Sequence, residues 1–294
     1  MEKKICLSII VVLISVYQLN AQVYNLNVAV ELINDLDTGR GQLNLSCWNK
    51  DYCDYYLSFS FNNAEGFEGM PSTDTWTVVG PGRRQIRIYK TKQGATHFSY
   101  RMGYLAMYRG NITLKPDIDF VYALPAAAGK AATIGISGMP GDQKLIFDLP
   151  TDTVYACREG VMCDDNLSDH SRRIFNRSDM SQITLYHKDG SFGGYVFKGK
   201  TLVAPGEKIK MGNPIAVVEK VYGTSLSFSV CFLDKSKFEV PWGSKHTSLM
   251  PFFHTVNEGK VQLKTDGSYV GELTNTLLMQ DMSRHEKKVF MRNK

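Results

Sequence analysis

Residues 183–197 read ITLYHKDGSFGGYVF, a pattern typical of a β-hairpin. Residues 183–187 and 194–197 are rich in β-branched and aromatic side chains, and Lys188-Asp189-Gly190 supplies a turn between them. The next segment, residues 203–218, reads VAPGEKIKMGNPIAVV and again alternates short apolar runs with turn-forming residues. We therefore expect short antiparallel strands in this half of the chain.

The N-terminal half shows a similar pattern from Val23 to about Tyr122. Residues 57–62 alternate large apolar side chains with Ser and Asn, as a strand with one buried face requires. Turn-forming residues at 38–41, 62–63 and 80–82 separate such runs. This spacing favours an antiparallel β-sandwich, and no segment shows a convincing helical period. The predicted fold class is therefore all-β.

The segment LPAAAGK, residues 124–130, is the natural boundary between two domains because Pro, Ala and Gly crowd there. We expect a sandwich-like domain over residues 22–123 and a second β domain over residues 124–234. Residues 235–294 form a C-terminal extension with a hairpin signal at Thr265-Asp266-Gly267 and a basic, frayed tail from Arg284.

The first 21 residues have the features of a signal peptide. Lys3 and Lys4 precede an apolar run centred on residues 9–16, and Leu19-Asn20-Ala21 offers small residues for cleavage. The apolar run is short for a membrane span, and no later segment is long enough for one. We expect export to a periplasmic or extracellular space and no integral membrane anchor.

The charge balance points to no particular polymer. The formal net charge is +5, of which the leader supplies +1. Basic residues gather over residues 83–92, where a solvated sheet face is the simpler interpretation and an anionic glycan the alternative. An exported protein meets little nucleic acid, so we expect no nucleic-acid partner.

The cysteines suggest disulfides rather than a structural metal site. Cys47 and Cys53 are separated by five residues, and so are Cys157 and Cys163. In an oxidising compartment each pair is a candidate disulfide that would staple a hairpin. Cys231 makes the count after the leader odd, and CxxC spacing typical of structural zinc is absent.

Three collinear segments resemble the lysostaphin-type (LytM-like) zinc peptidases, which cut peptidoglycan cross-bridges. Residues 148–161, DLPTDTVYACREGV, are similar to that family's aspartate-containing entry strand and the hairpin after it. Residues 183–195 resemble its "HxDGT…Y" hairpin, and residues 203–218 resemble its "VKVGQKVKKGQPIG" element. The resemblance implies that the second domain has the family's duplicated hybrid motif β fold.

The same resemblance implies that the catalytic centre is degenerate. The family holds zinc with His, Asp and a second His, and uses further histidines in catalysis. Asp148 matches the ligand aspartate, but no histidine lies between His97 and His170. Residues 223–230 read GTSLSFSV, so Ser225 and Ser227 stand in place of the family's His-x-His, and Phe197 replaces a catalytic His. We therefore expect no metal, no cofactor and no enzymatic activity.

These observations favour an exported, catalytically inactive peptidase-like protein that binds, scaffolds or regulates in the cell envelope. Peptidoglycan or an envelope protein is the expected partner. The ancestral groove is expected to be bordered by these residues: Asp148, Tyr195, Phe197, Ser225 and Ser227.

Two alternatives stay open. The first is an active peptidoglycan metallopeptidase with an atypical metal site, built from some of the remaining histidines: His170, His187, His246 and His254. His187 is otherwise interpreted as a solvated hairpin histidine. The second alternative is a purely structural component of an envelope or secretion assembly.

Overall fold

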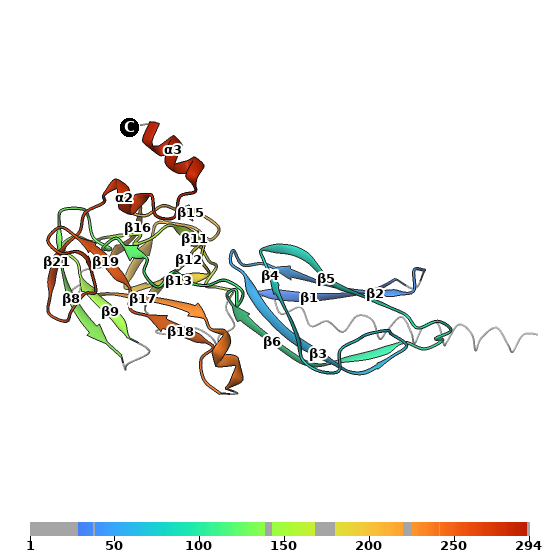
Figure 1. Cartoon of the computed structure of the whole chain (residues 1–294). Coiled ribbons are helices and arrows are strands. Elements are labelled where there is room, and N and C mark those ends of the chain that lie inside the picture. Colours follow the sequence, from blue (N-terminus) through green and yellow to red (C-terminus); the bar gives the residue numbers. More distant parts are fainter. Residues whose placement is uncertain are drawn as a thin grey trace, which may run out of the picture.

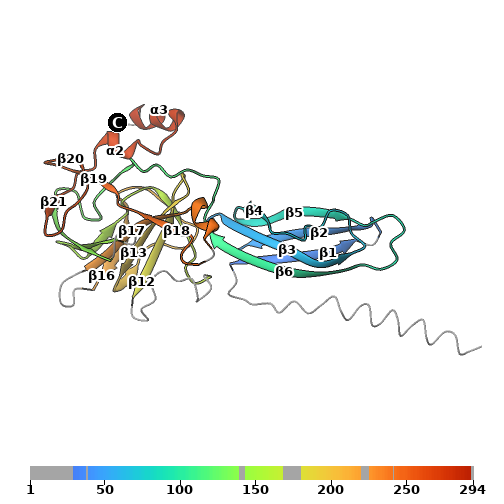
Figure 2. The same cartoon turned by 60° about the horizontal axis from the view of Figure 1, so that its bottom comes forward.

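The computed structural model describes residues 29–37, 39–138, 143–167, 180–219, 225–240 and 242–292. Strands dominate these residues, which confirms the all-β prediction. The strands form two β bodies placed end to end (Figures 1 and 2). The expected signal peptide lies outside the described residues, and within them no helix is both long and apolar enough to cross a bilayer.

The first body is an antiparallel sandwich of two three-stranded sheets. One sheet has the order β1 (Val30–Asp37), β2 (Gln42–Asn49), β5 (Gly82–Lys90). The other has the order β4 (Thr75–Val79), β3 (Tyr55–Glu65), β6 (Ser99–Arg109). Alternate residues of β2 and β3, such as Leu45 and Phe59, are buried between the sheets.

The second body is built on a nine-stranded antiparallel sheet. Its order is β15 (Lys208–Ile209), β11 (Gly160–Met162), β12 (Ser181–Tyr186), β13 (Ser191–Phe197), β17 (Ser225–Leu233), β9 (Lys144–Asp148), β8 (Ala131–Ser137), β21 (Ser268–Val270), and β18 (His246–Leu249) also pairs with β17. A three-stranded sheet has the order β10 (Thr153–Tyr155), β16 (Pro214–Val218), β14 (Gly199–Thr201). The predicted hairpin around Lys188-Asp189-Gly190 is confirmed, because β12 and β13 pair antiparallel across it.

The C-terminal extension completes the second body instead of standing apart. β18 and β21 join the long sheet, and β19 (Phe252–Thr255) pairs with β20 (Gly259–Val261) and, in parallel, with β7 (Val121–Tyr122). The last strand of the sandwich, β6, ends at Arg109. β7 lies within residues 22–123, the range expected for the sandwich, but it pairs with β19 of the second body. The Thr265-Asp266-Gly267 turn leads into β21, which pairs with β8 and not with β20.

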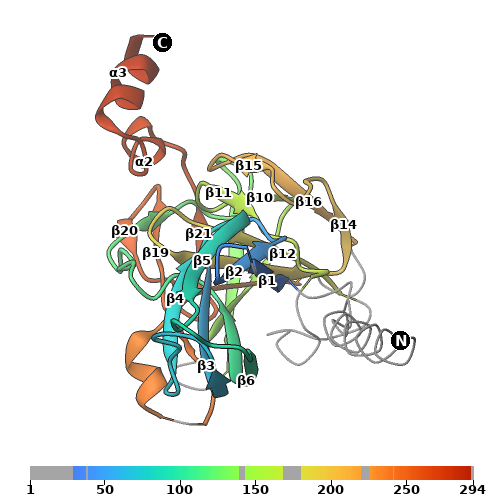
Figure 3. The ribbon, with the colours of Figure 1, turned by 90° about the vertical axis from the view of Figure 1, so that its right-hand side faces the viewer.

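Short helices cover the end of the chain, where the sequence showed no helical period. They are η2 (Lys235–Glu239), α2 (Asn275–Leu278) and α3 (Arg284–Arg292). Ser283 and Glu286 form a capping box at α3, with the Ser283 amide donating to Glu286 Oε2 at 2.6 Å. The expectation of a frayed tail is therefore wrong over residues 284–292. Figure 3, viewed from the sandwich end, shows α2 beside the second body and α3 projecting away from it.

The core of the sandwich extends across the junction between the two bodies. Cys163 and Phe192, both from the second body, are buried in the same cluster as the sandwich residues Cys53 and Tyr55. Arg109 ends β6 and bonds Asp165 of the second body at 2.7 Å. The two bodies thus share buried apolar and charged contacts, and sites at their junction have walls from both.

Candidate functional site

Asp148 lies at the end of β9, at one end of the long strand β17. It stands opposite Ser225 on β17 and opposite Thr133 on β8. Ser227 stands opposite Ile146 on β9 and Val196 on β13. Asp148 is exposed, and burial alternates along β9 so that Leu145 and Phe147 face the core. This end of β17 therefore joins one exposed carboxylate to neighbours with hydroxyl or alkyl side chains.

Tyr195 and Phe197 lie on the opposite face of the sheet. Tyr195 pairs with Phe228, the neighbour of Ser227, and successive residues of a strand point to opposite faces. Both aromatic side chains are fully buried in the core of the second body. The Cys157 amide donates to the Tyr195 hydroxyl at 2.8 Å. The expectation of one groove bordered by all five residues is therefore wrong for Tyr195 and Phe197.

The remaining histidines of the described residues are held in separate places. His187 is buried, so its interpretation as a solvated hairpin residue is wrong. One nitrogen of the His246 ring lies 2.8 Å from the Arg109 carbonyl oxygen, and His254 lies 4.0 Å from Glu272. His170 lies outside the described residues. In the part of the chain that the structure describes, potential metal ligands gather in a group of three only at Asp51, Cys53 and Cys163, at the junction of the two bodies.

His187 is packed against the side chains that hold the C-terminal extension. Its Nδ1 lies 2.7 Å from the Glu159 carbonyl oxygen, and burial followed by the nearby Arg158 lowers its pKa to about 4. The Arg158 guanidinium is itself buried and bonds Asp189 and Asp281, each at 2.9 Å. This network joins the β12–β13 hairpin to the extension, and a neutral His187 fits it as a structural residue.

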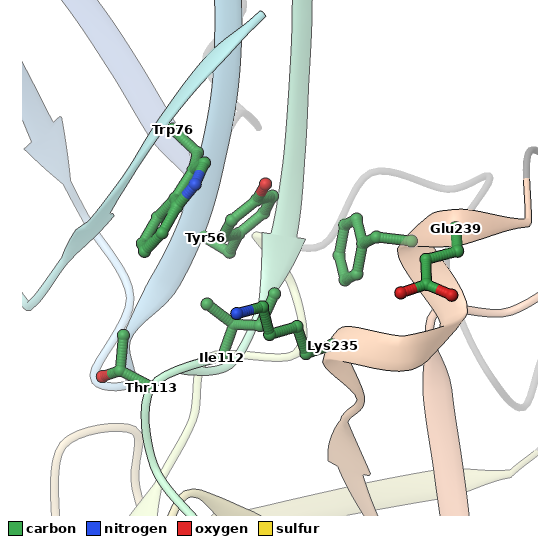
Figure 4. A pocket seen from close by; sticks show the side chains of 7 residues that line it. Tyr56, Trp76, Ile112, Thr113, Lys235 and Glu239 are labelled. Carbon is green, nitrogen blue, oxygen red and sulfur yellow. The ribbon is translucent and has the colours of Figure 1, made fainter.

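The other end of β17 leads into a pocket of about 540 Å³ where the two bodies meet (Figure 4). Its lining residues come from β3, β4, the segment after β6, and η2: Tyr56, Trp76, Ile112, Thr113, Lys235, Phe238 and Glu239. A nine-residue strand spans about 27 Å between its first and last Cα atoms. The pocket and the Asp148 region therefore lie at opposite ends of one strand.

Aromatic rings form one side of this pocket. The ring of Tyr56 lies 5.8 Å from Trp76 and 4.8 Å from Phe238, between centroids. Trp76 keeps 52% of its surface exposed, whereas Tyr56 is buried. Burial raises the pKa of Tyr56, so its hydroxyl stays protonated at neutral pH. Exposed ring surface beside hydroxyl groups can contact an apolar or sugar-like ligand face.

Two charged side chains come from the same short helix as Phe238. Lys235 and Glu239 are exposed and come from η2, as Figure 4 shows. Asp234 caps η2 by accepting from the Ser236 amide at 2.9 Å, and it also accepts from the Thr247 hydroxyl of β18. Because η2 is fixed to β18 in this way, the second body contributes a defined wall with a charge of each sign.

Sequence reasoning missed this pocket. Trp76 sits in DTWTVV, where alternation within β4 makes it an outward residue, and this was an available signal. Its approach to Tyr56 and Phe238 depends on how the bodies meet, which local spacing does not reveal. The cysteine pairs were missed for the same reason. The buried thiols of Cys47, Cys53, Cys157 and Cys163 form no disulfide in the structure, and Cys53 lies beside Cys163.

Comparisons with known proteins add little to this geometry. No protein-family model and no curated protein matches the chain. Among solved structures, the chain is similar to Csd3 from Helicobacter pylori, with 8% sequence identity over 90% of this chain and 83% of that one, and a TM-score of 0.26. A likeness at this TM-score carries no argument. The peptidase resemblance therefore rests on the sequence motifs given above.

Proposed function

We propose that this chain is an exported, catalytically inactive peptidase-like protein that binds a ligand in the cell envelope. The observation that carries the proposal is the register around Asp148. The aspartate that matches the family's zinc ligand stands opposite Ser225 and Thr133, where a hydrolytic site needs imidazole groups. Neutral serine and threonine hydroxyls are poor zinc ligands, because zinc in proteins is bound by thiolate, imidazole or carboxylate.

The residues that stand in place of the family's histidines also fit into the packing of the second body. Ser227 sits between Ile146 and Val196 in the ladder of the long sheet, so backbone pairing with both neighbouring strands holds this position. On the other face, Phe197 fills the core with an apolar ring. A side chain packed in this way stabilises the domain without a role in proton transfer. These contacts support a peptidase-like fold whose former catalytic end is now structural.

The binding surface in this proposal is the pocket at the opposite end of β17. Ligand sites are common where domains meet, and they combine apolar rings with a few polar groups. Here Trp76 and Tyr56 offer ring surface, while Lys235 and Glu239 offer one charge of each sign. Peptidoglycan supplies matching chemistry, since its sugars present apolar ring faces and its peptides carry amines and carboxylates. Peptidoglycan is therefore the proposed ligand, and an envelope protein the alternative partner.

A sedimentation experiment with purified sacculi tests both halves of the proposal. The chain without its leader, residues 22–294, is incubated with sacculi and zinc, and bound protein and released soluble fragments are measured together. The proposal predicts saturable co-sedimentation and no release of fragments above a protein-free control. Release of fragments would establish the active metallopeptidase instead. Absence of binding would remove peptidoglycan as the ligand and favour a protein partner or a structural role.

A further inference from the structure

Two cysteines that are distant in the sequence meet where the two bodies join. Cys53 precedes β3 in the sandwich, and Cys163 follows β11 in the second body. Both are fully buried, and their Sγ atoms and a carboxylate oxygen of Asp51 all lie within 4.8 Å of one another. Their expected sequence partners have other hydrogen-bond partners: Cys47 is hydrogen-bonded to the Arg84 backbone, and Cys157 to the Tyr195 side chain.

The backbones on both sides of this pair are held by hydrogen bonds. Asp51 Oδ1 accepts from the Asp164 amide at 2.8 Å, which ties the residue after Cys163 to the loop that carries Cys53. The Cys163 amide donates to the Thr184 carbonyl at 2.9 Å. The Cys53 carbonyl accepts from Asn49 Nδ2 at 2.8 Å. The two thiols are therefore brought together by a fixed frame and not by chance contact of mobile loops.

A metal ion is a poor fit to the same three residues. Asp51 Oδ2 accepts from Arg109 at 2.8 Å, from the Tyr55 hydroxyl at 3.0 Å and from Cys53 Sγ at 3.4 Å. Oδ1 accepts from the amides of Tyr52 and Asp164. A carboxylate used in this way has no lone pair left for a metal, and the Arg109 guanidinium would repel a cation. The geometry leaves the two sulfur atoms as the reactive pair.

We propose that Cys53 and Cys163 form a disulfide that joins the two bodies. The two thiols react with an external disulfide RSSR of an oxidising compartment. One S–S bond forms between Cys53 and Cys163, the S–S bond of RSSR breaks, and the two thiol protons end on two RSH molecules. The cysteines lose two electrons and RSSR gains them, so the exchange is balanced. The expected export of the chain supplies the compartment in which such disulfides persist.

Burial of the two thiols determines the stage of folding at which the disulfide forms. Burial, followed by the neighbouring Cys163, raises the pKa of the Cys53 thiol, and the thiolate is the form that attacks a disulfide. Oxidation therefore takes place during folding, before the junction closes, and the bond is then shielded from reductants. The cross-link closes the chain from Cys53 to Cys163 into one loop, which restricts the unfolded state. It also fixes Tyr56 of the sandwich relative to Phe238 of the second body, the two walls of the pocket.

Refolding under redox control tests the proposal. The chain of residues 22–294 is reduced, unfolded and refolded with oxidised and reduced glutathione, then alkylated and digested without reduction. We expect a linked peptide pair containing Cys53 and Cys163, with the remaining three cysteines alkylated. The oxidised protein should melt about 5–10 °C above the protein refolded with dithiothreitol.

Single variants separate this bond from the alternatives. Cys53→Ser and Cys163→Ser should lose the linked pair and the rise in melting temperature, whereas Cys47→Ser and Cys157→Ser should keep both. If a Ser variant does not fold, the peptide map of the unaltered chain decides alone. Five alkylated cysteines, or links between Cys47 and Cys53 or Cys157 and Cys163, would overturn the proposal. One zinc ion per chain that Cys53→Ser abolishes would do so too. The peptide map and the melting temperatures are measured without sacculi, so failure of this proposal is distinguished from failure of the binding proposal.

Discussion

The two ends of β17 differ in the chemistry they present. At the Ser225 end, an exposed carboxylate stands opposite hydroxyl and alkyl neighbours, and the aromatic residues behind it fill the core. At the Leu233 end, η2 and the sandwich enclose a pocket with exposed ring surface and two opposite charges. The first end carries residues of the sequence resemblance, whereas the second end has exposed ring surface and charged groups. The proposed scaffold therefore rests on the sequence resemblance, whereas the candidate binding site rests on the geometry of the junction between the two bodies.

The largest expected effect shows whether Phe197, near the Ser225 end, is a core residue or a ligand-binding residue. Phe197→Ala should lower the free energy of unfolding by about 3–5 kcal/mol, because a fully buried ring leaves a cavity. Affinity for sacculi, corrected for the folded fraction, should not change. Urea unfolding and a binding titration on the same samples check this, with Phe197→Leu as a milder control. A stable variant that loses binding would restore Phe197 to a ligand groove.

The next effect concerns His187 and pH. Its pKa is about 4 in the folded protein against an ordinary value of 6.5, so the unfolded chain takes up the proton first as pH falls. This contribution to stability is present above pH 6.5 and is lost as pH falls towards 4. The difference between the two pKa values corresponds to about 3 kcal/mol.

His187→Asn isolates that contribution, because an amide still donates to the Glu159 carbonyl but does not titrate. Between pH 7.5 and pH 4.5 the unaltered protein should lose about 2–3 kcal/mol more stability than the variant in urea unfolding. Equal losses in both proteins would mean that His187 is protonated in the folded state. Such a result would reopen the question of how its charge is accommodated beside Arg158.

At the pocket end, a surface tryptophan should matter for binding and little for stability. Trp76→Ala should weaken binding to sacculi by about 2 kcal/mol, or roughly thirtyfold. Trp48→Ala is the matched control, since Trp48 is also partly exposed on the sandwich but lies on the other sheet. Co-sedimentation isotherms of the two variants check this. Equal affinities would place the ligand elsewhere on the molecule.

The smallest expected effect is at the Ser225 end, where restoring two histidines should produce no peptidase activity. The double variant Ser225→His, Ser227→His should release no soluble fragments from sacculi in the presence of zinc. The upstream ligand histidine is still missing, Phe197 still occupies a catalytic position of the family, and catalytic groups that act as a unit are not additive. Fragment release by the double variant would show that two imidazoles suffice to rebuild the site.

What the sequence predicted well was local, and what it missed depends on distant pairing. The β12–β13 hairpin followed from its turn and flanking strands. The faces of Tyr195 and Ser227 depended on the register between β13 and β17, which a single-strand pattern does not contain. The contact of Cys53 with Cys163 depended on how the two bodies meet. The Ser283–Glu286 capping box is a local signal for α3 that the interpretation of a frayed, basic tail did not use.

Zinc content distinguishes an inactive site from a metallopeptidase centre, because the described strand neighbours of Asp148 carry no imidazole. The chain of residues 22–294 is loaded with excess zinc, desalted and subjected to elemental analysis beside Asp148→Asn. Much less than one zinc per chain is expected in both proteins. One tightly held zinc per chain that Asp148→Asn removes would contradict this expectation and restore a metallopeptidase centre at this end of β17.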